Sequence, residues 1–228
     1  MSLSPTADEI KQVAHSVVRV LTARGLKTCL FGGAACYLYG NSRTPNDVDI
    51  VVLTSNHTTE DLKLFISRAD PSTFYLRPSK KVGETYKILW ARLRGNVFYT
   101  RRSCKVDILI PGILNIPSVP HHLVINLNNL PVMPIIPLLM LKLQGWEDHR
   151  LSSRFDMQQK QYVDIRDISQ LLQVAINRGE TLQDELVWLP EEFIDAGRVR
   201  LAKYLEILRP TNAGSWKVVG FEVNEQYL

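Results

Sequence analysis

The chain has 228 residues, of which 45% are hydrophobic and 22% are charged, so it can bury a core as one domain or two small ones. Its net charge of +4 is too small to indicate nucleic-acid binding by itself, and its three widely spaced cysteines, without a CxxC pair, do not support a zinc site or a disulfide framework. No run approaches the ~18 apolar residues of a membrane span. Without an apolar N-terminal segment of signal-peptide length, we expect a soluble intracellular protein.

The first 110 residues alternate between helical and strand-like patterns. Thr6 precedes apolar residues at helical spacing, and Gly25 ends them, which predicts a capped amphipathic helix. Strands are expected at 28–31, 48–53, 74–77, 86–93 and 104–110, and helical segments at 34–39 and 58–68. The pairs Lys80-Lys81 and Gly95-Asn96 are expected to form turns between the last three strands. This order predicts an α/β or α+β sheet domain over residues 1–115.

The composition changes in the second half. Residues 111–137 contain six prolines, so we interpret residues 116–137 as a proline-rich connector rather than as part of a strand-rich core. Helices are expected at 138–148, 158–177, 181–189 and 191–208, and the final WKVVGFEV is expected to form a short strand or a tail. A helical C-terminal domain over residues 138–228 is therefore predicted.

Three aspartates stand in or beside strand-like runs. Asp47 and Asp49 are two residues apart at the start of an apolar strand, so their side chains share one face. Neighbouring carboxylates repel each other, and Mg²⁺, which binds a few carboxylates together with phosphate oxygens, relieves that repulsion. Asp107 interrupts the apolar run CKVDILI, where an acid is costly without a partner. If its strand lies beside 48–53, the three acids converge, and two ions about 3.5–4 Å apart can clamp a phosphoryl transfer.

Each of these features has a simpler explanation when it stands alone. An Asp-x-Asp pair is common at solvated strand ends, the pair Gly32-Gly33 can mark a turn, and Asp107 can face solvent on a half-exposed strand. Their succession is more specific, because a glycine pair that lets a backbone approach phosphates is followed, after about a dozen residues, by two acids that can hold a cation. Together the features favour chemistry on a nucleoside triphosphate.

The segment CLFGGAACYLYGNSRTPNDVDIVVL resembles the signature of the DNA polymerase β-like nucleotidyltransferase superfamily. With Arg43 and Thr44 just before the acids, it is most similar to the AbiEii-like nucleotidyltransferases, a group that includes toxins of bacterial toxin–antitoxin systems. The resemblance implies a mixed β-sheet with helices on one side, followed by a helical C-terminal region that completes the nucleotide site.

The resemblance also assigns roles to residues. It implies that Gly32 and Gly33 contact the triphosphate, that Asp47 and Asp49 bind two Mg²⁺ ions, and that Asp107 completes the metal site and helps to activate the acceptor hydroxyl. Many members carry Gly-Ser, whereas alanine follows the glycine pair here. The phosphate must therefore be held by backbone N–H groups at the start of the helix.

In the helical half, Lys142 lies within an apolar helix face. AbiEii-like enzymes use a helical lysine to contact the nucleotide phosphates, and Lys142 fits that place. Asp164 or Asp167 is expected to orient Lys142 or the acceptor, and Asp164 is preferred. The alternatives are a lysine that extends into solvent and a surface pair of Lys160 with Asp164, with Asp167 as a cap.

The predicted function is a Mg²⁺-dependent nucleotidyltransferase that moves a nucleoside monophosphate from an NTP to an acceptor hydroxyl and releases pyrophosphate. The acceptor can be RNA or tRNA, a protein or a small molecule. One alternative is a catalytically inactive nucleotide-binding or interaction protein on the same fold. Another is an aminoglycoside-type enzyme that modifies small molecules. A deep acidic pocket favours the aminoglycoside type, and a broad basic cleft favours tRNA.

Overall fold

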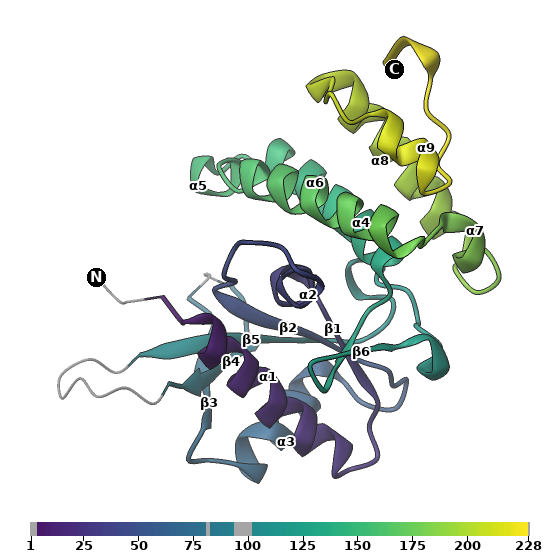
Figure 1. Cartoon of the computed structure of the whole chain (residues 1–228). Helices are drawn as coiled ribbons and strands as arrows, with labels where there is room; N and C mark the ends of the chain where they lie inside the picture. Colours follow the sequence, from purple (N-terminus) through teal and green to yellow (C-terminus); the bar gives the residue numbers. More distant parts are fainter. Residues whose placement is uncertain (1–3, 81–82, 94–101, 228) are drawn as a thin grey trace. The chain divides into compact units, whose positions relative to one another are not determined.

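The computed structural model describes residues 4–80, 83–93 and 102–227, which divide into two units (Figure 1). The first, here the sheet unit, comprises residues up to Leu38 together with Ser42–Ile116 and His121–Met133. The second, here the helical unit, comprises Tyr39–Asn41, Pro117–Pro120 and Pro134–Leu228. No helix within these described ranges combines the length and the apolar character needed to cross a membrane.

The sheet unit alternates helices and strands before it ends in a meander and a hairpin. In chain order its elements are α1 (Ala7–Thr22), β1 (Thr28–Phe31), α2 (Gly32–Tyr39, whose last residue belongs to the helical unit), β2 (Asp47–Val52), α3 (Thr59–Ala69), β3 (Phe74–Pro78), β4 (Lys87–Arg92), β5 (Ser103–Leu109), two 3₁₀ segments (Ile113–Asn115 and His121–Leu123), β6 (Ile125–Leu127) and β7 (Leu130–Val132).

The described strands form one mixed sheet in the order β3-β4-β5-β2-β1-β7-β6. The pairs β2–β5 and β1–β7 are parallel, and the other neighbours are antiparallel. Helices α1 and α3 contact each other and lie together along one face of this sheet (Figure 1). Val48 and Ile50, which alternate with the two acids of β2, are fully buried, so one face of that strand is core. The predicted mixed sheet with helices and a helical C-terminal region is confirmed.

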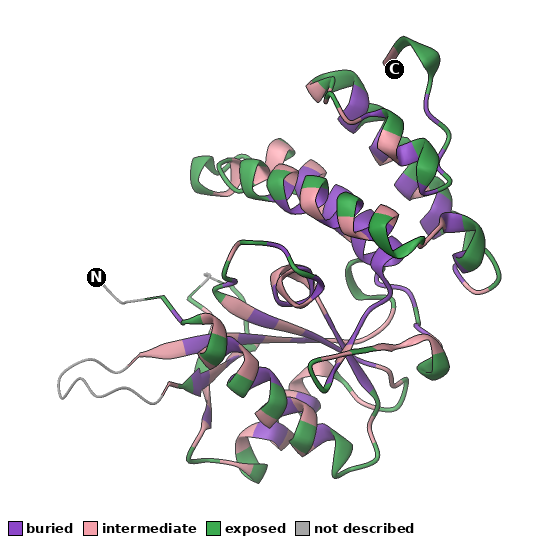
Figure 2. Ribbon diagram, in the orientation of Figure 1, coloured by how far each residue is buried: buried purple, intermediate pink, exposed green. Residues whose placement is uncertain are grey.

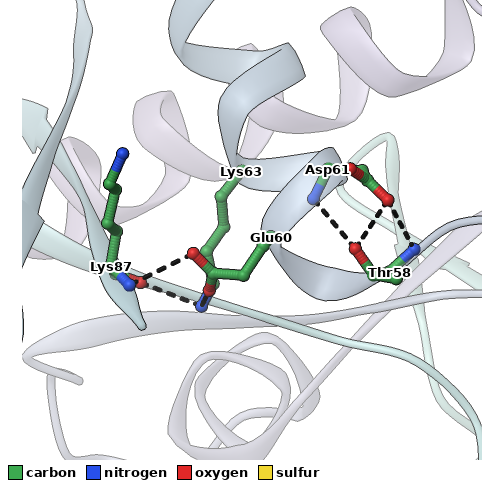
Figure 3. A network of polar contacts seen from close by, with 5 residues as sticks. All are labelled: Thr58, Glu60, Asp61, Lys63 and Lys87. Carbon is green, nitrogen blue, oxygen red and sulfur yellow. Dashed lines mark hydrogen bonds and ion pairs between the residues drawn. The ribbon is translucent and has the colours of Figure 1, made fainter. Parts of the chain in front are cut away.

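Polar contacts fix α3 at its N-terminus (Figure 3). Thr58 and Asp61 form a capping box, in which each side chain accepts a hydrogen bond from the other residue's backbone N–H. Glu60 accepts a hydrogen bond from the backbone N–H of Lys87, and Lys63 donates to the Lys87 carbonyl at 2.9 Å. These bonds join the first turn of α3 to the start of β4 and hold the helix in place on the sheet.

Two strands lie in the segment 116–137, which the sequence led us to expect as a connector without them. Asn128 and Asn129 have φ of 53° and 60°, and they join β6 and β7 as a two-residue hairpin loop with positive φ at both positions. Pro131 is within β7, yet Met133 N–H still bonds the Leu30 carbonyl of β1 at 2.9 Å. We expected no strand here because proline lacks the N–H group that a strand ladder uses, yet Pro131 is paired with Asn126 of β6.

The helical unit consists of α4 (Ile135–Leu151), α5 (Phe155–Gln158), α6 (Gln161–Arg178), α7 (Leu182–Glu185), α8 (Glu191–Leu208), α9 (Gly214–Val218) and a 3₁₀ segment (Glu225–Tyr227). Its core contains a row of edge-to-face aromatic rings, formed by Trp146, Tyr204, Trp216 and Phe221, with neighbouring centroids 5.0, 6.4 and 5.4 Å apart. The buried residues of α6 recur at helical spacing, whereas residues 135–140 of α4 are buried on every side (Figure 2).

The prediction of a strand or tail for WKVVGFEV is wrong over its first residues, which form α9. The fully buried Trp216 packs between Tyr204 and Phe221, and a helical turn places its ring there. The predicted turn at Gly95-Asn96 and Lys81 of the other predicted turn lie outside the described residues.

We expect Glu9→Gln to destabilise the sheet unit by about 1–3 kcal/mol. Arg102 donates two hydrogen bonds to Glu9, at 2.7 and 2.8 Å, and both side chains are at most 15% exposed. Burial alone would raise the pKa of Glu9, but the bonds from Arg102 and Thr6 outweigh it and lower the pKa. The contribution is therefore complete above about pH 4.5, the ordinary value, and is lost as the pH falls through the lower folded value.

Urea unfolding of the wild type and Glu9→Gln across this pH range tests the expectation, because the difference in free energy of unfolding should shrink on acidification. Asp8→Asn is the matched control, since Asp8 is 83% exposed and pairs with Lys11 at the surface. A difference that stays constant from neutral pH to acid pH would show that the ionised Glu9 is not the stabilising species.

Candidate active site

The parallel register between β2 and β5 brings three aspartates together. Asp49 lies opposite Asp107, and Asp47 lies opposite Lys105, so the four side chains share one face of the sheet. One oxygen from each of Asp47, Asp49 and Asp107 lies within 4.8 Å of the others, and all three residues are half-buried. The acid triad, as we call these three residues, has the convergent geometry that the sequence led us to expect.

The start of α2 lies directly against this triad. Gly32 follows β1, has a φ of 60°, and is so close to Asp49 that a Cβ at Gly32 would lie 2.1 Å from the Asp49 carboxylate oxygen Oδ2. A Cβ at Gly33 would lie 2.9 Å from Nη2 of Arg43. The glycine pair therefore lets the first turn of α2 pass between a carboxylate and a guanidinium group. The first N–H groups of a helix lack helical partners and favour anions, which makes this turn suited to a phosphate as well as to Asp49.

Lys105 is a site residue that our sequence interpretation missed. Its ammonium nitrogen lies 2.6 Å from Oδ2 of Asp107, and the two side chains are 38% and 33% exposed. Burial lowers the pKa of Lys105, but the charge and hydrogen bond of Asp107, with the charges of Asp47 and Asp49, outweigh this and raise it. The spacing in CKVDILI contained the signal, because residues two apart in a strand face the same side.

Cys104, the residue before Lys105 on β5, is not placed to act as a ligand of the acid triad. Cys104 is fully buried on β5, and its burial, with the negative charges of Asp47 and Asp49, raises its pKa to about 12. Cys104 alternates with Lys105 along β5, so its side chain lies on the other face of the strand from Lys105 and Asp107. The donors that the triad offers are therefore carboxylate oxygens.

These donors fit a hard divalent cation. Mg²⁺ prefers oxygen ligands and typically takes one or two carboxylates, with waters and phosphate oxygens completing its octahedron. The three carboxylates can supply the protein ligands, and their partial exposure leaves room for the remaining ones. The arrangement can hold a cation beside a phosphate bound at the start of α2.

The other predicted nucleotide-binding residues form a buried charged cluster in the helical unit. Lys142 of α4 lies 2.9 Å from Asp164 and 2.8 Å from Asp167, both of α6, and His149 lies 2.5 Å from the second oxygen of Asp164. Lys142, Asp164 and Asp167 are 8%, 5% and 1% exposed. Asn41 also donates a hydrogen bond to the carbonyl of Asp167 at 3.0 Å.

This geometry decides between the alternatives for these residues. Lys142 does not extend into solvent, and Asp164 does not form a surface pair with Lys160, because both aspartates are buried against Lys142. The expected orientation of Lys142 by an aspartate is present, and it involves both aspartates rather than one. Contact between Lys142 and a nucleotide stays a prediction.

Comparison with known proteins identifies the class of fold. The chain is similar in structure to an antigenic nucleotidyltransferase-like protein from Paracoccidioides brasiliensis, with 22% sequence identity, a TM-score of 0.66, and coverage of 98% of this chain and 97% of that one. It is also similar to JHP933 from Helicobacter pylori, with 18% identity, a TM-score of 0.53, and coverage of 90% of this chain and 76% of that one. The protein therefore has a nucleotidyltransferase-like fold.

Sequence comparison does not assign the chain to a family. No protein-family model and no curated protein sequence matches the chain. The comparisons thus confirm a nucleotidyltransferase-like fold, and the superfamily and AbiEii-like assignments stay predictions.

We expect Gly32→Ala to disturb the acid triad beyond its effect on the backbone. A left-handed backbone costs a non-glycine residue roughly 1–2 kcal/mol, and at Gly32 the new methyl group would also collide with the Asp49 carboxylate. Gly25→Ala is the matched control, because Gly25 has a φ of 74° and no atom within 4 Å of the added Cβ. Urea unfolding should show the larger loss for Gly32→Ala, and equal losses would mean that Asp49 moves aside freely.

We expect Lys142→Met to destabilise the helical unit by about 3–5 kcal/mol, because it leaves two buried carboxylates without their cation. Lys203→Met is the control, since Lys203 pairs with Glu147 while remaining 48% exposed and should cost less than about 1 kcal/mol. The free energy of unfolding in urea measures both. A loss below 1 kcal/mol for Lys142→Met would contradict the inference that this cluster stabilises the helical unit.

Proposed function

We propose that the protein is a Mg²⁺-dependent nucleotidyltransferase that transfers a nucleoside monophosphate from an NTP to an acceptor hydroxyl, with release of pyrophosphate. The observation that carries this proposal is the convergence of Asp47, Asp49 and Asp107 beside the glycine turn of a nucleotidyltransferase-like fold. A fold alone hosts active and inactive proteins, so the acid triad is what favours catalysis over simple binding.

In this proposal the acid triad binds the cations, and the turn formed by Gly32 and Gly33 binds the phosphates. Asp47 and Asp49 hold the cations, of which we expect two, and Asp107 completes the metal site and helps to activate the acceptor hydroxyl. The bound cations supply charge neutralisation for the triphosphate and for the leaving pyrophosphate. Gly32 and Gly33 hold the phosphates through backbone N–H groups at the start of α2.

The reaction then follows from this positioning. The acceptor oxygen attacks the α-phosphorus in line with the bond to the leaving group, a new P–O bond forms, and the P–O bond to pyrophosphate breaks. The proton of the hydroxyl passes to Asp107 or to solvent. Because little covalent chemistry falls to the protein, charge stabilisation and alignment supply most of the rate enhancement.

We assign Lys142 and Asp164 to nucleotide binding within the same proposal. The support for this assignment is the sequence pattern; in the structure Asp164 and Asp167 hold the Lys142 ammonium group in one position. The sequence pattern around both residues, together with Arg43 and Thr44 before the acids, supports an AbiEii-like enzyme. RNA or tRNA, protein and small molecules are the acceptors to be compared.

The test is transfer of label from each of the four NTPs, with Mg²⁺, to total RNA, to protein and to small hydroxyl compounds including aminoglycosides. Incorporation into one of these classes identifies the acceptor. Nucleotide binding without incorporation into any of them would instead favour the inactive nucleotide-binding protein. Omission of Mg²⁺ should abolish the transfer, and its persistence in the presence of EDTA would contradict the metal requirement.

We expect Asp49→Asn to lower the transfer rate by about 100-fold or more, because it removes a charged metal ligand. Its free energy of unfolding should stay within about 1 kcal/mol of the wild type or rise, because one of three mutually repelling charges is removed. Asp156→Asn is the control, since Asp156 pairs with Arg154 at the surface. Full activity in Asp49→Asn would refute the metal-binding role.

A further inference from the structure

We propose that Lys105 is a built-in counter-ion of the acid triad, a positioning residue whose ammonium group bonds Asp107 and competes with a divalent cation for that carboxylate. The inference rests on the proposed function, because it requires that the triad binds a divalent cation. It adds Lys105 to the site, and it makes the binding of the cation depend on whether Lys105 leaves Asp107.

The position of Lys105 follows from the sheet. On β5 it lies two residues before Asp107 on the same face, and on the neighbouring β2 its register partner is Asp47. Its ammonium nitrogen contacts Oδ2 of Asp107 at 2.6 Å, the distance of a short charge-assisted hydrogen bond. Lys105 therefore lies on the same face of the sheet as the three acids and is in direct contact with one of them.

A divalent cation and this ammonium group need the same carboxylate. The Asp107 oxygen that accepts the Lys105 hydrogen bond offers less electron density to a metal ion, and the positive charge repels the ion directly. At 38% exposure and with a flexible four-carbon stem, the Lys105 side chain has room to leave Asp107 when a cation arrives. Binding of the cation is thus an exchange of one positive group for another.

Lys105 also serves the metal-free protein. Three carboxylates within 4.8 Å repel one another, and the bond from Lys105 relieves that repulsion without closing the site to solvent. Removal of its charge should therefore have two opposite effects. The metal-free protein should become less stable, and the divalent cation should bind more tightly.

The experiment measures Mn²⁺ binding to the full chain, after treatment with EDTA and its removal, by electron paramagnetic resonance of free Mn²⁺. The variants are Lys105→Met and, should the methionine variant fold poorly, the neutral and polar Lys105→Gln. We expect the affinity for Mn²⁺ to rise by about tenfold or more in the neutral variants, because a unit charge no longer opposes the dication at close range. Lys105→Arg, which keeps the charge, should bind Mn²⁺ as the wild type does.

Lys63→Met is the matched control, because Lys63 on α3 belongs to the Glu60 and Lys87 network instead of the triad (Figure 3). Its affinity for Mn²⁺ should equal that of the wild type. Thermal unfolding provides a second measurement, in which Lys105→Met should melt below the wild type in EDTA and gain more from added Mn²⁺. A lysine with a purely structural role would lower stability without tightening the binding of the cation.

The outcomes separate this inference from the function on which it rests. Unchanged or weaker Mn²⁺ binding in the neutral Lys105 variants, with wild-type binding that depends on Asp49, overturns the counter-ion role and leaves the proposed metal site in place. Wild-type binding that is absent, or that survives Asp49→Asn, overturns the proposed metal site and the counter-ion role together.

Discussion

The parallel register between β2 and β5 is the constraint on which the candidate site depends. Asp49 faces Asp107 only because these two strands are neighbours and are aligned without a slip. A shift by one residue would turn Asp107 to the other face of the sheet and bring Val106 or Ile108 to the triad. Both of these apolar side chains are buried, so the free energy of core packing holds the register. The same interactions that fold the sheet therefore place the acids.

This placement concentrates negative charge, and the fold limits the cost in two local ways. Lys105 bonds one of the three carboxylates, and the first turn of α2 brings the positive end of a helix dipole next to Asp49. Gly32 makes the second contribution possible, because any side chain at that position would collide with Asp49. The glycine is thus required for electrostatics as much as for its backbone conformation.

The charged residues of the helical unit are arranged differently from those of the acid triad. Its cluster joins two carboxylates of α6 to Lys142 and His149 of α4, and its central members are shielded from water. Pairing of this kind makes the removal of one member costly and gives the two helices a fixed mutual position. The triad is instead half-exposed and made of like charges, which is the condition under which an added cation stabilises most. The two groups therefore differ in solvent exposure and in charge balance.

The sequence by itself determined the local features of this protein. Period-two and period-3.6 patterns placed most strands and helices to within a few residues, and spacing alone put Asp47 and Asp49 on one face of a strand. Only the tertiary structure decided which strands are neighbours, and with that the approach of Asp107 and Lys105 to the first two acids. It likewise decided the pairing of β7 with β1 and the burial of Lys142 between aspartates. These features depend on contacts between residues far apart in the chain, and a local pattern contains no information on the register or packing that creates them.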